Sequence, residues 1–403
     1  MNKPELLAPA GDFSKLKTAL YFGADAVYVG GKAFSLRALA GNFDNQELKE
    51  AVEYTHALGK KIYVTVNILA RNSDREKAIE YLTFLNEIKP DGIIAADIGL
   101  LSLAKQYAPK VELHASTQMN VLNSDTVKFL LDFGVKRVVL ARELSLKEIS
   151  EIHNDVPDMQ LEAFAHGAMC ISYSGRCLLS NYLTGRDSNR GACVQACRWN
   201  YEIREKSREG EYYPIEEDEH GTYILNSKDL NMIEHFYDLA NAGVCSFKIE
   251  GRMKSEYYIA TVVNAYRRAI DSYYNFGNTD FTPYVEELNK TVHRDFTTAY
   301  MYGENEQTVN YNDSQSKGTH TFIANVLEDF NGEYAVIEQR NRFKKGDFLE
   351  VLSPSTEHNK LITIDKLLDD KNEQVDDAKY VMQRLKLYTN IPLKTGDLLR
   401  RKV

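Results

Sequence analysis

Residues 5–31 read ELLAPAGDFSKLKTALYFGADAVYVGG and contain the unit whose repetition decides the fold. The runs Glu5–Ala8 and Ala26–Val29 have the length and apolar composition of buried strands. Between them, Ser14–Phe22 carries apolar residues at helical spacing. A strand, a helix and a second strand in this order predict two parallel strands joined by a helical crossover.

The same alternation continues along the chain. Six further buried strands are predicted, at Lys61–Val66, Gly92–Ala95, Glu112–Ala115, Arg137–Leu140, Leu161–Ala165 and Ser246–Ile249. Amphipathic helices between the strands include Asn45–Leu58, Arg75–Ile88 and Ser124–Phe133. Eight strands rich in Val, Ile and Ala that alternate with helices favour a TIM-type (β/α)8 barrel. A doubly wound open sheet is the alternative that this pattern leaves open.

Polar residues and glycines follow nearly every predicted strand. The carboxyl ends of the strands meet at one rim of a (β/α)8 barrel, and the chemistry of such barrels takes place there. The candidate site residues on or near this rim are Asn67, His114, Gln118, Arg142, His166 and Arg252. For the two histidines, a structural role in the core is an equally good interpretation.

Four of the five cysteines lie in one segment after the seventh predicted strand. Cys170 and Cys177 occur in EAFAHGAMCISYSGRCLLS, and Cys193 and Cys197 in NRGACVQACRW. The amino terminus has no apolar core of signal-peptide length, so we expect a cytoplasmic protein with reduced thiols rather than disulfides. Four reduced thiolates that lie close together in the sequence predict a metal site.

The spacing of the cysteines bears on the identity of the metal. Cys193 and Cys197 are four residues apart and would share one face of a helical turn, whereas Cys170 and Cys177 bracket a loop. Neither pair has the tight C-x2-C spacing of a zinc knuckle. Thiolates from separate segments suit an iron–sulfur cluster. Zinc is the alternative on the number of ligands alone.

Basic residues near the same rim predict an anionic ligand. Arg37 follows the second strand, Arg176 lies between two cysteines, and Arg252 and Lys254 follow the eighth strand. Ser255 is placed to cap the helix that begins after them. Loops after the last two strands of such barrels often hold phosphate, so we expect a phosphate or a carboxylate here. Solvated surface cations are the other interpretation.

The pattern changes after the barrel. We place a barrel domain at residues 1–305, with a cysteine-rich insertion at 168–222 after strand seven. A linker follows at 306–317, and a small antiparallel β-barrel at 318–403. Short strands and the turns FNGE, KKGD and KTGD support the last assignment.

Composition limits the classes of partner. The 403 residues are 43% hydrophobic and carry a formal net charge of −9. An acidic balance argues against non-specific binding of nucleic acid but leaves room for a local basic site. No apolar run approaches the roughly 20 residues that a membrane span requires, so we expect no membrane partner.

Several segments together resemble the collagenase-like peptidase family, whose catalytic type is unassigned. They are EAFAHGAMCISYSGRCLLS, ELLAPAGDFSKLKTALYFGADAVYVGG, HASTQMN, RVVLARELSLKEI, RGACVQACRW and FKIEGRMKSEYYIATVVNAYRRAID. The resemblance spans nearly the whole chain, including the small C-terminal barrel. Within the family, the chain is most similar to the proteins of prephenate-dependent tRNA uridine 5-hydroxylation.

This resemblance implies an RNA-modifying enzyme that hydroxylates the wobble uridine of tRNA to 5-hydroxyuridine, with prephenate as co-substrate. It implies a [4Fe-4S] cluster on Cys170, Cys177, Cys193 and Cys197, with zinc as a replacement in aerobically purified protein. Cys245 matches no ligand position and is assigned to packing. Relatives that work as paralogue pairs suggest a paralogous partner protein.

The remaining site assignments rest on barrel geometry alone. We expect catalytic roles for His166, Arg176 and Arg252. We expect substrate binding by Arg37, Asn67, His114, Gln118, Arg142 and Lys254.

Two other functions stay open. The first is hydroxylation of another substrate, either ribosomal RNA or a small aromatic such as a quinone precursor; the small C-terminal barrel favours RNA. The second is proteolysis, because His166 lies four residues before Cys170 and imitates a cysteine–histidine pair. The chain contains no HExxH or GxSxG motif. A catalytic nucleophile would account for only one of the clustered cysteines, whereas a metal site accounts for all four.

Overall fold

The computed structural model of the protein describes residues 3–36, 41–170, 172–173, 176–177, 179–194, 196, 216–218, 221–223, 227–303 and 318–403. The chain divides into two compact units. Unit 1 comprises residues 1–16, 24–254 and 294–316, and unit 2 comprises residues 17–23, 255–293 and 317–403. Across the described ranges, every helix is too short or too polar to cross a bilayer.

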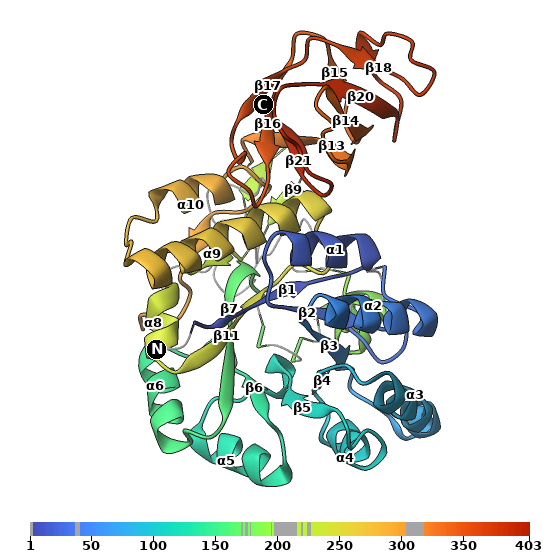
Figure 1. Ribbon diagram of the computed structural model, residues 1–403. Helices are drawn as coiled ribbons and strands as arrows, with labels where there is room; N and C mark the ends of the chain where they lie inside the picture. Colours follow the sequence, from blue (N-terminus) through green and yellow to red (C-terminus); the bar gives the residue numbers. More distant parts are fainter. Residues whose placement is uncertain are drawn as a thin grey trace. The chain divides into compact units, whose positions relative to one another are not determined.

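Eight parallel strands close into a barrel in unit 1. They are β1 (Glu5–Pro9), β2 (Ala26–Gly30), β3 (Lys61–Val66), β4 (Gly92–Ala95), β5 (Glu112–Ala115), β6 (Arg137–Val139), β7 (Gln160–Ala168) and β11 (Val244–Ile249). Each strand pairs with the next one, and β11 pairs with both β7 and β1 (Figure 1). This closure confirms the predicted TIM-type barrel and excludes the open sheet.

Helices alternate with these strands as the sequence periodicity predicts. They are α1 (Phe13–Tyr21), which spans the two units, and α2 (Asn45–Ala57), α3 (Arg75–Ile88), α4 (Ile98–Tyr107), α5 (Ser124–Phe133), α6 (Leu146–Asp155) and α8 (Phe236–Asn241). Helices α2 to α6 surround the barrel strands in Figure 1. Every residue of β2 and β4 is buried, as expected for strands that helices cover on the outside and side chains fill on the inside.

Side-chain caps fix where several helices begin. At the start of α6, Ser145 Oγ accepts a hydrogen bond from the Glu148 N–H at 3.3 Å, and the Glu148 carboxylate accepts one from the Ser145 N–H at 2.8 Å. This reciprocal capping box satisfies two backbone donors that the helix itself leaves unpaired.

Replacing Ser145 with alanine should therefore lower the free energy of unfolding by about 1 kcal/mol. Urea denaturation followed by circular dichroism measures this change. The control is Lys147→Ala on the same helix, where the lysine side chain is 87% exposed; it should change the stability by no more than about 0.5 kcal/mol. Equal losses in the two variants would contradict the role of the cap.

Additional elements follow β7. A short helix α7 (Leu179–Thr184), the hairpin of β8 (Glu216–Asp218) and β9 (Gly221–Tyr223), and β10 (Asp229–Asn231) lie between β7 and β11. β10 pairs antiparallel with the end of β7, and β12 (Phe296–Thr297) pairs with β10. Much of the predicted insertion, including residues 197–215, lies outside the described residues.

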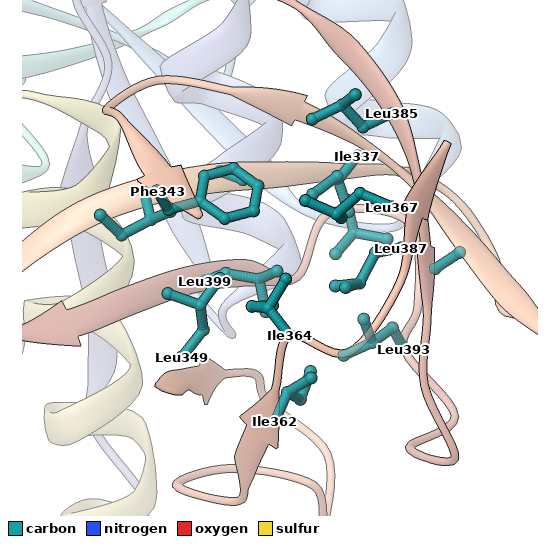
Figure 2. Close-up of a cluster of buried hydrophobic side chains, with 14 of the residues drawn as sticks. Ile337, Phe343, Leu349, Ile362, Ile364, Leu367, Leu385, Leu387, Leu393 and Leu399 are labelled. Carbon is teal, nitrogen blue, oxygen red and sulfur yellow. The ribbon is translucent and has the colours of Figure 1, made fainter. Parts of the chain in front are cut away.

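Besides the end of α1, the described residues of unit 2 include two further helices and a set of antiparallel strands. The helices are α9 (Glu256–Phe276) and α10 (Thr282–Leu288). The strands are β13 (His320–Glu328), β14 (Tyr334–Gln339), β15 (Phe343–Lys344), β16 (Phe348–Leu352), β17 (Leu361–Thr363), β18 (Leu367–Leu368), β19 (Asp377–Ala378), β20 (Arg384–Tyr388) and β21 (Leu398–Lys402). Figure 2 shows the apolar side chains that they bury, such as Ile337, Leu387 and Leu399. The predicted antiparallel strands and the Ser255 cap of α9 are confirmed.

A buried ionic network joins α10 to the strands of unit 2. Arg400 on β21 is fully buried, and its guanidinium donates to Glu287 Oε2 at 2.9 Å and to Glu350 Oε1 at 2.8 Å. Lys290 Nζ lies 2.8 Å from Glu350 Oε1, and His358 Nε2 lies 3.4 Å from Glu287 Oε2. The buried Glu287 and the half-buried Glu350 thus both have cationic partners, as burial of charge requires.

Candidate functional site

A cavity lies at the carboxyl ends of the barrel strands in unit 1. Residues on or just after β2, β3, β5, β6, β7 and β11 line it, together with parts of the cysteine segment. Its polar and charged residues include Thr65, Asn67, Ser116, Gln118, Arg142, Lys248, Glu250 and Arg252. The predicted rim therefore holds a cavity, and Asn67, Gln118, Arg142 and Arg252 line it.

Three of the four clustered cysteines line this same cavity. Cys170 is exposed, while Cys177 and Cys193 are half-buried. Local hydrogen bonds hold their segments, because the Cys177 carbonyl accepts from Ser188 Oγ at 2.7 Å and from Asn189 Nδ2 at 3.2 Å. Cys177 and Cys193, which are 16 residues apart in the sequence, thus line the same cavity. Cys197 lies outside the described residues.

The fit of these thiols to a metal depends on the kind of metal centre. In the part of the chain that the structure describes, no three His, Cys, Asp or Glu side chains meet closely enough to hold one metal ion. In an iron–sulfur cluster the thiolates bind different irons of a larger core, so the sulfurs do not converge on one point. Three thiols around one cavity are compatible with such a core. The metal site itself stays a prediction.

Arg252 is the most constrained cation on the cavity wall. It is 4% exposed, and its guanidinium donates to Ser35 Oγ at 2.8 Å, Thr65 Oγ1 at 3.2 Å and Asn42 Oδ1. Gly30 makes room for it, since an added Cβ there would collide with the guanidinium. These hydrogen bonds fix the orientation of the guanidinium on the cavity wall.

Arg142 approaches the cavity from the end of β6. Its Nη1 donates to the Ala168 carbonyl at 2.8 Å, and its guanidinium carbon lies 3.8 Å from the centre of the Phe164 ring. A cation held over an aromatic face keeps its charge while losing conformational freedom. The structure thus places two fixed guanidinium groups, those of Arg142 and Arg252, on one cavity.

Lys248 and Glu162 form an ion pair inside the barrel, with Nζ and Oε1 2.7 Å apart. Glu162 also accepts from Arg137 Nη1 at 3.2 Å, and Arg137 in turn donates to Glu5 at 2.6 Å. Burial would raise the pKa of Glu162, but the charges of Lys248 and Arg137 outweigh it and lower that pKa. Lys248 reaches the cavity, whereas Glu162 lies behind it.

Sequence reasoning missed Lys248 and Glu162 because it treated the strand interiors as packing and searched only the strand ends. A signal was present nonetheless. Glu162 lies in the apolar run LEAFA and Lys248 in the run FKI. A charge inside a strand that is buried on both faces needs an opposite charge. Two strands with one such charge each predict an ion pair.

Several predicted site residues lie away from the cavity. His114 is fully buried beside Tyr63, with ring centres 4.9 Å apart, and burial lowers its pKa. His166 is 2% exposed with its ring against Phe296 at 5.6 Å. Among the described lining residues of the cavity, neither histidine occurs. Both positions fit the structural interpretation that the sequence left open.

Two predicted cations also lie elsewhere. Arg176 lines a second, adjacent cavity together with Asp97 and Gln118, and its Nε donates to Asn120 Oδ1 at 2.9 Å. Lys254 does not occur among the described lining residues of either cavity. Arg37 falls outside the described residues.

Comparison with known proteins gives consistent results. The sequence profile of Peptidase family U32 matches residues 11–311, and the profile of the U32 C-terminal domain matches residues 318–400. The chain is 41% identical to tRNA hydroxylation protein P1 of Bacillus subtilis, over 99% of this chain and 95% of that protein. It is 40% identical to tRNA hydroxylation protein P of Escherichia coli, over 88% and 87% of the two chains. A 23S rRNA 5-hydroxycytidine synthase of Escherichia coli is 37% identical over 75% of this chain and 45% of that protein.

Proposed function

The chain belongs to peptidase family U32, and from that membership we propose that it takes part in the hydroxylation of tRNA. The observation that carries this proposal is the identity of 40–41% to two proteins named for tRNA hydroxylation, over most of both chains. Such similarity over barrel and C-terminal strands alike supports a shared substrate class as well as a shared fold.

In its finer form, the proposal is conversion of the wobble uridine to 5-hydroxyuridine, with prephenate as co-substrate and a [4Fe-4S] cluster as cofactor. Cys170, Cys177, Cys193 and Cys197 would hold the cluster, and the first three line the barrel cavity. When bound, such a cluster supplies one-electron redox chemistry or a coordination site for substrate.

Within this proposal, the guanidinium groups on the cavity wall bind the carboxylates of the co-substrate. Arg142 and Arg252 are held in place by Phe164, Ser35 and Asn42, so little conformational entropy is lost on binding. Prephenate carries two carboxylates, which matches the two guanidinium groups.

The peptidase alternative receives less support from the same cavity. A cysteine nucleophile requires a histidine within hydrogen-bond reach. Cys170 lines the cavity, whereas His166 packs against Phe296. We therefore assign His166 a structural role in place of the predicted catalytic one.

Mass spectrometry of tRNA nucleosides tests the proposed function. A host strain without any U32 family gene, complemented with this chain, should regain 5-hydroxyuridine-derived nucleosides in tRNA. A gain of 5-hydroxycytidine in ribosomal RNA, with unchanged tRNA, would contradict the proposal and favour the ribosomal alternative. Cleavage of gelatin by the purified chain, without either nucleoside, would favour the peptidase.

Replacing Arg252 with glutamine should raise the KM for prephenate about 10- to 100-fold, because a charged hydrogen bond contributes about 1.5–3 kcal/mol. The Kd for tRNA should change far less. The matched control is Lys110→Gln, an exposed cation that precedes β5 at the opposite end of that strand. A variant that loses tRNA affinity but keeps its KM for prephenate would assign Arg252 to the RNA site.

A further inference from the structure

Lys248 is a buried amine that lines the barrel cavity. It is 4% exposed, and its Nζ lies 4.5 Å from the centre of the Tyr28 ring and 5.6 Å from that of Phe164. Tyr28 and Phe164 line the same cavity. A molecule bound in the cavity therefore meets a desolvated amine beside two aromatic rings.

Burial of Lys248 favours the loss of its proton, and nearby charges act in both directions. Lys248 shares the Glu162 carboxylate with Arg137. Glu162 Oε1 lies 2.7 Å from Lys248 Nζ, and Glu162 Oε2 accepts a hydrogen bond from Arg137 at 3.2 Å. Burial lowers the pKa of Lys248, and the charges of Arg137 and Arg142 lower it further, against the opposing effect of Glu162. A lysine desolvated in an apolar pocket or placed beside another cation is activated as a nucleophile.

The cavity also holds a cation suited to a carboxylate near this amine. Arg142 and Lys248 both contact the Phe164 ring, so the guanidinium and the amine lie on the same part of the wall. We infer that Lys248 forms a Schiff base with the carbonyl group of a 2-oxo acid whose carboxylate is bound by Arg142. In a 2-oxo acid these two groups are directly bonded, which fits neighbouring partners on one wall.

The reaction balances without an added oxidant or reductant. The ammonium of Lys248 gives one proton to the Glu162 carboxylate, and the neutral amine then attacks the carbonyl carbon to give a carbinolamine. The hydroxyl group leaves as water with the proton that Glu162 returns, and a protonated C=N bond remains. Addition of water reverses these steps and restores both the 2-oxo acid and Lys248.

This inference deepens the proposed function and rests on it for the reaction that the adduct serves. Prephenate is itself a 2-oxo acid, so the adduct would fix the proposed co-substrate beside Arg142. Formation of the adduct requires neither tRNA nor a metal cluster. Its failure is therefore distinguishable from a failure of tRNA hydroxylation, which the nucleoside measurement reports separately.

Reductive trapping on the full chain tests the inference. The protein is incubated with pyruvate or with phenylpyruvate and cyanoborohydride, which reduces an imine to a stable secondary amine. Digestion and mass spectrometry then locate the adduct. We expect one adduct, on the peptide that contains Lys248, with a yield that saturates as the 2-oxo acid concentration rises.

Two lysine variants sharpen this test. Lys248→Arg keeps a positive charge beside Glu162 but has no amine that can form the imine, so the adduct should disappear. Lys105→Arg is the matched control and should keep it, because Lys105 donates to the Phe133 carbonyl at the surface. Absence of an adduct in the unmodified chain with both acids, or an even spread over exposed lysines, would overturn the inference. Because this result is measured on the unmodified chain, it would overturn the inference even if Lys248→Arg did not fold.

Discussion

Cys170→Ser protein, purified without oxygen, should lack the broad visible absorption of an iron–sulfur cluster and should leave tRNA without 5-hydroxyuridine. In the proposed cluster the Cys170 thiolate is a ligand, and a serine hydroxyl is a far poorer ligand for iron. Because the cluster needs all four positions, we expect activity to fall to background rather than to an intermediate level. Anaerobic absorption spectra and iron analysis measure the loss of the cluster, and tRNA nucleoside analysis measures the loss of activity.

Serine at Cys177, Cys193 or Cys197 should have the same effect, and Cys245 provides the control. Cys245 lies on β11 at an exposed position rather than in the packing role assigned from sequence, and its Sγ lies 3.3 Å from the Leu161 carbonyl. Cys245→Ser should keep the colour and the activity. A colourless anaerobic protein with one tight zinc would contradict the cluster, and full activity of Cys170→Ser, Cys193→Ser protein would end the metal interpretation.

Arg400→Met should produce the largest loss of stability, about 3–5 kcal/mol in the free energy of unfolding. The substitution keeps an unbranched side chain but removes the cation that pairs with the buried Glu287 and the half-buried Glu350. Urea denaturation measures the total loss, and hydrogen exchange should place it in residues 318–403. Arg401→Met is the matched control.

The control differs from Arg400 in its exposure. Arg401 pairs with Asp347 at 2.8 Å, but its side chain is 39% exposed. A surface pair of this kind contributes about 0–1 kcal/mol. Losses of equal size at the two neighbouring arginines would contradict the energetic importance of the buried network.

The pH dependence of Arg400→Met follows from Glu287. Burial would raise the pKa of Glu287, but the hydrogen bond from His358 and the charge of Arg400 outweigh it and hold that pKa well below its ordinary value. A lowered pKa stabilises the folded state above the unfolded-state pKa of about 4.3, and this contribution is lost as the pH falls below it. The stability difference between parent and variant should therefore be largest near neutral pH and shrink in acid.

The barrel was predictable because each of its strands carries its own local signal. β3, β4 and β5 have the bounds that the sequence predicts. The prediction for β7 was too short. It extends through His166 to Ala168 because β10 pairs with its end, and no local pattern reports a partner strand that lies 60 residues away.

The site was predictable only in part, for a physical reason. Strand ends can be read from the sequence, so Asn67, Gln118, Arg142 and Arg252 were found. Whether a side chain at such an end turns toward the cavity depends on neighbouring packing, which placed His166 against Phe296. Lys248 was missed because it lies inside a strand rather than at its end, although its charge in an apolar run pointed to the ion pair that β7 and β11 form.

The pairing of β11 with both β1 and β7 has a consequence for biosynthesis. Ser246 on β11 donates to Glu5 on β1 at 2.9 Å across a separation of 241 residues. A ribosome releases the amino terminus first, so the cysteine segment emerges while β1 and β7 still have unpaired edges. Pairing over such a separation is slow, because the loop between the strands must close first. The nascent chain therefore passes through a stage at which two strand edges are exposed and open to aggregation.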